Sequence, residues 1–267
     1  MITALGLGLA VGVIMALTGA GGGILAVPLL IFGLQLSVAQ AGPIGLLAVG
    51  LAATLGAAVG LKAGIVRYRA ALLMSITGML LSPVGIWLAH QLDNRWLSIL
   101  FSFILFFIAY RTFYQANDHS LHIEENHTPK LACVRDAHSG QFIWTTRCAR
   151  ALAISGGIAG LFSGLLGVGG GFVIVPALQR YTDLVMQSVI ATSLTVIALV
   201  SLVGVLFSAT TGTMNWAVAI PFCTGAFTGM IIGKLISSRL TSPRLQISFF
   251  AILSAIVAAG MMIKSIA

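Results

Sequence analysis

The chain alternates between apolar runs and short polar connections. In the first half the apolar runs cover residues 2–17, 24–34, 38–61, 70–90 and 96–113. In the second half they cover residues 151–166, 172–178, 184–208, 216–236 and 245–263. A helix needs about 20 apolar residues to cross the roughly 30 Å hydrocarbon core of a bilayer, and shorter runs count as half-helices or buried segments. The pattern therefore predicts an all-α integral membrane protein with two sets of five segments, some of them short.

A single polar stretch separates the two sets. Residues 115–148 hold four of the six acidic residues and four of the five histidines. We therefore predict a first membrane repeat at 1–114, a polar cytoplasmic linker at 115–150 and a second membrane repeat at 151–267. The first apolar run lacks a basic start and a clear small-residue cleavage site, so we expect it to be a retained helix and not a signal peptide.

The two halves resemble each other. Sliding the sequence against itself by 148 residues aligns Gly12 with Gly160 and the triple glycine 21–23 with the triple glycine 169–171. The same offset aligns Val27 and Pro28 with Val175 and Pro176. A GxGGGxxxVPxL block that repeats in phase with many other matches indicates an internal repeat.

Basic residues in the connections predict how the halves are oriented. The connection after the third run carries Lys62, Arg67 and Arg69, whereas its equivalent at 209–215 is uncharged. The next connection of the second half carries Lys234, Arg239 and Arg244. Because basic loops face the cytoplasm, equivalent loops are expected on opposite sides. This favours ten crossings in an inverted-topology pair with both termini outside. Eight crossings in parallel repeats, with the short runs re-entrant, is the alternative.

Small residues recur at every fourth position in several apolar runs. The sets are Gly8, Gly12 and Ala16; Gly156, Gly160 and Gly164; Gly56, Gly60 and Gly64; and Gly225, Gly229 and Gly233. Such spacing lines one face of a helix with small atoms and predicts close packing against a neighbouring helix.

Composition supports a lipid environment and excludes several classes of protein. The 267 residues are 58% hydrophobic and 7% charged, with a mean hydropathy of +1.06, whereas soluble domains carry about 25% charged residues. The net charge of +8 comes from basic residues scattered between apolar runs, so we predict no nucleic-acid partner. Three cysteines indicate no disulfide framework, and Cys223 is expected to be a buried thiol.

The two glycine-rich motifs are the main candidate for a site. Each glycine weakens a helix by about 1 kcal/mol relative to Ala, so the helices should break there. Backbone breaks at membrane depth are tolerated only inside protein or beside a watery cavity, and paired breaks point to the central site of a transporter. The short segments that follow would present N–H groups and positive dipole ends, which favour an anion. Tight packing or a hinge is the structural alternative.

The predicted substrate site combines these motifs with nearby neutral polar residues. The motif residues are Gly19, Gly21, Gly22, Gly23, Pro28, Gly167, Gly169, Gly170, Gly171 and Pro176. The polar residues are Thr18, Gln40, Ser163, Thr192 and Ser193. Most Ser and Thr in membrane helices bond their own backbone, which is the alternative for each hydroxyl. No apolar run contains Asp or Glu, and cation pumps usually need such groups, so the substrate is expected to be an anion.

We predict no catalytic residue, no cofactor and no metal site. The His and Cys residues of the linker match no zinc module beyond an HxxH spacing. His90 lies at the end of an apolar run without a Ser or Cys placed to use it. The predicted partners are a small anionic substrate and the lipid bilayer, and the sequence leaves a coupling ion and a homo-oligomer open.

Four features of the chain are shared with a known family: the doubled GxGGGxxxVPxL block, the ten apolar segments, the polar linker, and the spacing of Gly212 and Trp216, which matches that of Gly64 and Tyr68. In these features the chain resembles the TauE/SafE sulfite exporter family. This family is also called the toluene sulfonate uptake permease family. The resemblance covers nearly the whole chain outside 115–150. It implies an inner-membrane permease for sulfur-containing anions such as sulfite, sulfoacetate or other sulfonates, without indicating which anion or direction. We expect alternating access; a passive anion channel is the alternative, and an intramembrane enzyme is less favoured.

Overall fold

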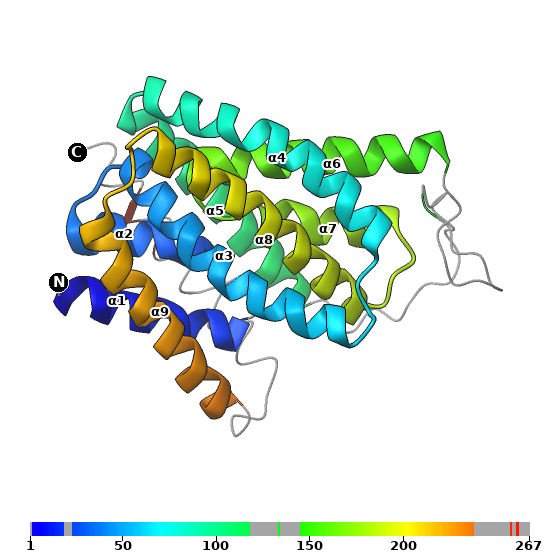
Figure 1. The fold of residues 1–267 in the computed structure, drawn as a ribbon, viewed down its shortest axis with the longest axis horizontal. Coiled ribbons are helices and arrows are strands. Elements are labelled where there is room, and N and C mark those ends of the chain that lie inside the picture. The colour runs from blue at the N-terminus through cyan, green and yellow to red at the C-terminus, as the bar shows by residue number, and fades with distance from the viewer. Residues whose placement is uncertain are drawn as a thin grey trace.

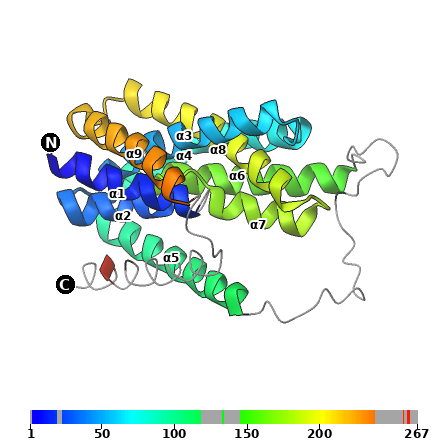
Figure 2. The same ribbon diagram turned by 90° about the horizontal axis from the view of Figure 1, so that it is seen from below.

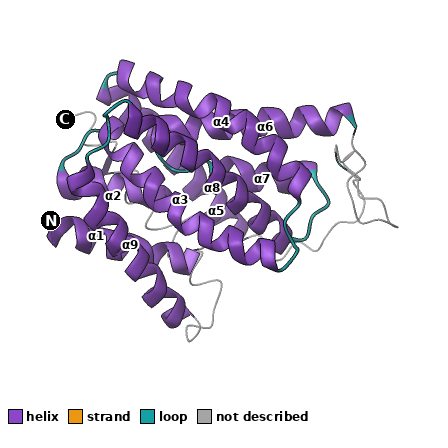
Figure 3. Ribbon diagram, in the orientation of Figure 1, coloured by secondary structure: helices purple, strands orange, loops and turns teal. Residues whose placement is uncertain are grey.

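The computed structural model describes residues 2–18, 23–117, 133, 145–237, 257, 260 and 261. Within these ranges the elements are helices joined by short turns, and none is a strand (Figure 3). The first half forms α1 (Ile2–Thr18), α2 (Ala26–Leu34), α3 (Val38–Lys62), α4 (Tyr68–Gln91) and α5 (Asn94–Asn117). The second half forms α6 (Thr146–Leu166), α7 (Gly171–Tyr181), α8 (Met186–Thr210) and α9 (Trp216–Ser237). The predicted all-α fold is confirmed.

Each of these helices corresponds to one predicted apolar run. The run at 245–263 falls largely outside the described residues. In the part of the chain that is described, five helices are long and apolar enough to cross a membrane: α3, α4, α6, α8 and residues Trp216–Gly233 of α9. Large apolar side chains cover the outer surface, among them Phe103 at 71% exposure and Leu80 at 69%. Such a surface is stable in lipid and not in water.

Local signals explain where the helices begin and end. Ser37 accepts a hydrogen bond from the Gln40 N–H and forms a capping box at the start of α3. Thr145 caps α6 by accepting from the N–H of Cys148. The Val38 N–H donates to Asn94 Oδ1 at 2.9 Å, which ties the start of α3 to the start of α5. These caps supply partners for N–H groups that a helix start leaves free. Figure 2 shows α5 to one side of the other helices.

Three helix pairs form the body of the molecule: α1 with α9, α4 with α6, and α3 with α8 (Figure 1). In the α3–α8 pair, Gly60 lies against Ala191 and Gly50 lies against Ser201, so the two helices run antiparallel. In the other two pairs the residue numbers of contacting positions rise together, so the helices run parallel. Short turns join α3 to α4 and α8 to α9. The three pairs are therefore connected and form one bundle of six helices.

Glycines bring the backbones of α1 and α9, and of α4 and α6, into direct contact. A Cβ atom built on Gly8 would overlap the carbonyl oxygen of Phe222, and one built on Gly12 would overlap that of Ala226. In the other pair, Gly156 meets the carbonyl oxygen of Met74, and Gly160 meets that of Gly78. The predicted close packing of these small-residue faces is confirmed.

The contacts of one pair reappear in the other at the same offset. Gly156 and Gly160 lie 148 residues after Gly8 and Gly12. Their contact partners, Met74 and Gly78, lie 148 residues before Phe222 and Ala226. The first segment of each half therefore packs on the fourth segment of the other half, through equivalent glycines.

Two equivalent turns lie at opposite ends of α8. The turn at 63–67 is held near the start of this helix, where the Arg67 N–H donates to Thr192 Oγ1 at 3.1 Å. The turn at 211–215 follows Thr210, the last residue of α8. The 18 residues between Thr192 and Thr210 correspond to a rise of about 27 Å. This is the separation that an inverted arrangement requires, and the membrane sides of the two ends stay a prediction.

The linker contains a disulfide bond that sequence analysis did not anticipate. Cys133 and Cys148 form a disulfide with a Cα–Cα distance of 4.9 Å. Cys133 is also held by the end of α7, because its N–H donates to the Tyr181 carbonyl at 3.0 Å. Sequence analysis predicted no disulfide framework and did not anticipate this single bond, which joins two cysteines 15 residues apart.

Candidate functional site: two helix breaks at the α3–α8 crossing

The second glycine motif breaks the chain between α6 and α7 as predicted. Gly167 is the C-cap of α6, with φ of 72°, and its N–H donates to the Ser163 carbonyl at 2.9 Å. Gly169 and Gly170 also have positive φ, 76° and 69°, and Gly170 is the N-cap of α7. Only glycine adopts this conformation without strain. The motif therefore ends one helix and starts the next within four residues.

Neighbouring backbones also require glycine in this motif. A Cβ atom on Gly167 would overlap backbone atoms of Gly42 in α3. A Cβ atom on Gly170 would lie 2.6 Å from the carbonyl oxygen of Ala159 in α6. Side chains at these two positions would force the break away from α3 and α6. Helix packing, the structural alternative for the motif, thus accounts for part of its glycine content.

The first glycine motif is described only at its last residue. Gly19, Gly21 and Gly22 lie outside the described residues, and so does the side chain of Thr18, the last residue of α1. Gly23 is buried and begins a short 3₁₀ turn that leads into α2. Pro28 is the third residue of α2, where its missing N–H has no intrahelical acceptor to lose.

The two motifs meet at one side chain in the centre of the molecule. A Cβ atom on Gly23 would lie 2.6 Å from Val49 Cγ2, and one on Gly169 would lie 2.9 Å from Val49 Cγ1. The same position on Gly169 is 2.9 Å from Ile197 Cγ2. Val49 and Ile197 lie near the middle of α3 and α8 and are equivalent at the offset of 148 residues. Both breaks therefore lie at the crossing of α3 and α8, halfway along the two long helices.

The predicted polar residues occupy different environments. Ser163 is fully buried, and its hydroxyl has no hydrogen-bond partner. Thr192 accepts from the Arg67 N–H, so it holds the turn between α3 and α4. Ser193 Oγ donates to the Ile190 carbonyl of its own helix at 2.8 Å. Gln40 is exposed and forms part of the capping box of α3. Of the five polar residues, only Ser163 is described with an unpaired hydroxyl beside a glycine motif.

One polar residue at the break was missed by sequence analysis. Ser201 of α8 is fully buried, and its hydroxyl has no partner. Its Oγ is 3.6 Å from a Cβ built on Gly169 and 3.6 Å from one built on Gly50. Ser201 lies four residues after Ile197 and therefore on the same face of α8. The spacing from Ile197 could have predicted that Ser201 faces the site. The sequence alone, however, does not show that this face of α8 meets the glycine motif.

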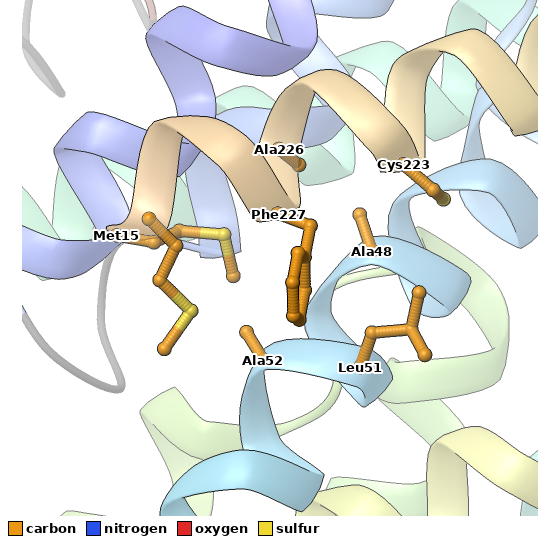
Figure 4. A pocket seen from close by; sticks show the side chains of 8 residues that line it. Met15, Ala48, Leu51, Ala52, Cys223, Ala226 and Phe227 are labelled. Carbon is orange, nitrogen blue, oxygen red and sulfur yellow. The ribbon is translucent and has the colours of Figure 1, made fainter. Parts of the chain in front are cut away.

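A small apolar pocket lies between α1, α3 and α9. Its lining residues are Met15, Ala48, Leu51, Ala52, Cys223, Ala226, Phe227 and Met230. Figure 4 shows these side chains, with the ring of Phe227 near the middle of the view. The volume of about 10 Å³ is at the lower limit for one water molecule and is too small for an oxyanion.

Among the described residues, the charges near the breaks are partial charges of the backbone. Asp93 and Asp183 lie in the turns that follow α4 and α7, away from the α3–α8 crossing. Among the described residues, no group of three His, Cys, Asp or Glu side chains can hold a metal ion. The 11-residue helix α7 begins at this site and contributes the partial positive charge of a helix N-terminus.

Comparison with known proteins identifies the family. The model of the family described as sulfite exporter TauE/SafE matches residues 4–261. The chain belongs to the TauE/SafE family. The chain is also 28% identical over 246 residues to a probable membrane transporter protein of Xylella fastidiosa (strain 9a5c), covering 91% of this chain and 87% of the relative. It is 26% identical over 244 residues to the probable membrane transporter protein YunE of Bacillus subtilis (strain 168), covering 88% and 87%.

Membership of the TauE/SafE family makes this chain a multi-pass membrane transporter and not an enzyme. It also implies a bilayer and a small substrate. No solved structure matches the chain at a significant level.

Proposed function

We propose that the protein moves small sulfur-containing anions, such as sulfite, sulfoacetate or other sulfonates, across the inner membrane. We further propose that the substrate is held where the two glycine-rich breaks meet at the α3–α8 crossing. The observation that carries this proposal is the convergence of Gly23 and Gly169 on Val49, near the middle of α3. Paired helix breaks at mid-membrane depth are typical of secondary transporters.

The electrostatics of the breaks support an anionic substrate. The start of α7 contributes about half a positive charge and N–H donors in its first turn. The described spans contain no Asp or Glu to hold a cation. An anion therefore gains free energy from the start of α7, whereas the described spans offer no acidic side chain to hold a cation.

The way the halves pack supports alternating access. The α1–α9 and α4–α6 pairs each join the first segment of one half to the fourth segment of the other. In an inverted-topology pair, one such unit can rock against the other and open the central site to either side. We propose that the two halves have inverted topology and that the linker is cytoplasmic.

A binding and transport screen tests the proposed function. Purified protein is titrated with sulfite, thiosulfate, sulfoacetate, taurine, acetate and chloride, and the protein is then reconstituted into liposomes with the best ligand. We expect binding of sulfite or a sulfonate in preference to acetate and chloride. Accumulation against a gradient, driven by an imposed ion gradient, indicates a carrier, whereas equilibration alone indicates a channel. Preference for a cationic amine would contradict the proposal.

A further inference from the structure

Five buried serine hydroxyls among the described residues have no hydrogen-bond partner. They are Ser75, Ser82, Ser163, Ser201 and Ser208, and each is 0% exposed. Other buried serines show the ordinary solution for a membrane helix, because Ser155 Oγ donates to the Ala151 carbonyl at 2.7 Å and Ser102 Oγ donates to the Ser98 carbonyl at 2.8 Å. A buried hydroxyl without a partner is costly, so five of them call for a ligand or a water.

Three of the five lie at nearly one level of the α4–α6–α8 interface. A Cβ on Gly164 would overlap the carbonyl oxygen of Ser82, which places Ser163 beside Ser82 along the helix axes. A Cβ on Gly204 would lie 3.1 Å from Ser82 Oγ, which places Ser82 level with this part of α8. Ser201 precedes Gly204 by three residues, an axial step of about 4.5 Å. Ser82, Ser163 and Ser201 thus lie within about one helical turn of one another along the helix axes, and we call these three residues the hydroxyl cluster.

The hydroxyl cluster adjoins the start of α7. Ser201 Oγ is 3.6 Å from the Cβ position of Gly169, the residue before the N-cap of α7. Ser163 lies in the last turn of α6, where its carbonyl accepts from the Gly167 N–H. Ser201 therefore brings a hydroxyl to the turn that carries the positive end of the α7 dipole, and Ser163 lies one helical turn before it on α6.

The equivalent interface, formed by α1, α3 and α9, has no hydroxyls at the corresponding positions. At the offset of 148 residues, Ser163 corresponds to Met15 and Ser82 corresponds to Met230. Ser201 corresponds to Ala53, and Ser75 corresponds to Cys223. Met15, Cys223 and Met230 line the apolar pocket of Figure 4. Equivalent positions thus carry oxygen in one interface and mostly sulfur in the other.

We propose that Ser82, Ser163 and Ser201 form an oxyanion-binding site, in which their hydroxyls donate hydrogen bonds to the oxygen atoms of a small tetrahedral or pyramidal oxyanion. The inference rests on the proposed function and assigns the recognition of oxygen atoms to the α4–α6–α8 interface alone. The ligand class is a sulfonate or sulfite group, whose oxygens accept several hydrogen bonds at once. Thioether and thiol groups are weak partners for such oxygens, so the pocket at α1, α3 and α9 is not a second copy of the site.

The test compares three substitutions with a control on α6, the helix that carries Ser163. Ser82→Ala, Ser163→Ala and Ser201→Ala are made singly and together in the full chain, and Ser155→Ala is the control because its hydroxyl is already paired. Each protein is purified in detergent, and binding of sulfite and sulfoacetate is measured by calorimetry. Hydrogen bonds to charged groups are stronger than average. We therefore expect a tenfold or larger rise in Kd for each single variant of the cluster and less than a twofold change for Ser155→Ala.

The melting temperature without ligand is a second measurement, and it should not fall when the affinity falls. Removing an unpaired buried hydroxyl relieves a desolvation penalty, so the three alanine variants should melt at or above the temperature of the unsubstituted protein. Unchanged sulfite and sulfoacetate affinity in the triple variant overturns the inference while the proposed function stands. A lowered melting temperature together with unchanged affinity also overturns it, because the hydroxyls are then structural. Failure of the unsubstituted protein to bind either anion overturns the proposed function, and this inference with it.

Discussion

The α4–α6 and α1–α9 interfaces have the same backbone packing and different chemistry. In both, glycines spaced by four residues bring a carbonyl oxygen of one helix against the Cα of the other. Around the first interface, Ser75, Ser82 and Ser163 are buried without partners. At the equivalent positions around the second, Cys223, Met230 and Met15 line an apolar pocket. The comparison shows that a repeated scaffold can keep the same backbone packing while only one copy carries unpaired hydroxyls at these equivalent positions.

The physical reason lies in what each position must satisfy. A glycine whose Cα touches a backbone carbonyl tolerates no side chain, because backbone cannot move aside as a flexible side chain can. A position that faces the interior beside the crossing must only fill space. It can therefore hold a hydroxyl where a ligand supplies the missing partner, or a thioether where packing alone is required.

The largest effect is expected when the break itself is filled. Gly170→Ala adds a Cβ 2.6 Å from the carbonyl oxygen of Ala159 at φ of 69°, so the start of α7 must shift. A displacement of about 1 Å at a binding site can reduce function 100-fold, and we expect a loss of transport of that order in liposomes. Gly22→Leu in the first motif should have a similar effect if both breaks hold the substrate.

Gly212→Ala controls for the backbone strain in Gly170→Ala. Gly212 also has φ of 69°, but nothing lies within 4 Å of its Cβ position. The left-handed conformation costs a non-glycine residue about 1–2 kcal/mol, so both variants lose stability while only Gly170→Ala should lose transport. Equal transport by the two variants would show that the second break is not the binding site.

The next effect concerns the packing that the two interfaces share. Gly160→Ala and Gly12→Ala each place a Cβ inside the backbone of the partner helix. Overpacking costs about 1–3 kcal/mol, and we expect both variants to melt at clearly lower temperatures in detergent, by similar amounts. If only one of them loses stability, the two interfaces are not equivalent in their packing.

The controls for this pair lie on the same two helices. Gly157 has only Leu81 Cδ1 near its Cβ position, at 3.6 Å, and Gly6 has nothing within 4 Å. Because Ala is favoured over Gly in a helix by about 1 kcal/mol, Gly157→Ala and Gly6→Ala should be neutral or stabilising.

A smaller effect is expected when a negative charge is introduced at Ser163 and at its equivalent position in the other interface, Met15. Ser163→Asp should raise the Kd for sulfite about tenfold more than Ser163→Asn does, because a carboxylate at this position repels a bound anion. Asn controls for size and polarity. The same exchange at Met15, the equivalent position, should produce a smaller difference. Equal Asp and Asn affinities at Ser163 would contradict an anion site there.

The smallest effect on transport is expected at the Cys133–Cys148 disulfide of the linker, which has no equivalent in the first half. Basic residues at the ends of α3 and α6 predict a cytoplasmic linker, and cytosolic thiols are mostly kept reduced. We therefore expect Cys133 and Cys148 to be reduced in growing cells and joined after treatment with an oxidant, as read by maleimide gel shift. Replacing both with Ser should change transport less than twofold. An intact disulfide in untreated cells would place the linker in an oxidising compartment and reverse the predicted orientation.

The sequence alone determined the helices, their breaks and the family. Apolar runs separated by polar connections determine which segments become membrane helices, because a segment in lipid must be apolar and must satisfy its own backbone hydrogen bonds. The GVGGG run likewise determined a break, since Gly167, Gly169 and Gly170 all require positive φ. The prediction of an anion site at the glycine motifs also came from local chemistry, and it remains to be tested.

The tertiary structure decided which side chains meet at the breaks. Ser193 and Ser201 lie on one helix, but Ser193 bonds the carbonyl of Ile190 while Ser201 faces the glycine turn without a partner. Cys133 and Cys148 gave no signal of pairing in the sequence, yet the structure joins them in a disulfide beside the end of α7. Hydropathy and spacing are properties of one segment, whereas the partner of a hydroxyl or thiol depends on which other segment packs against it.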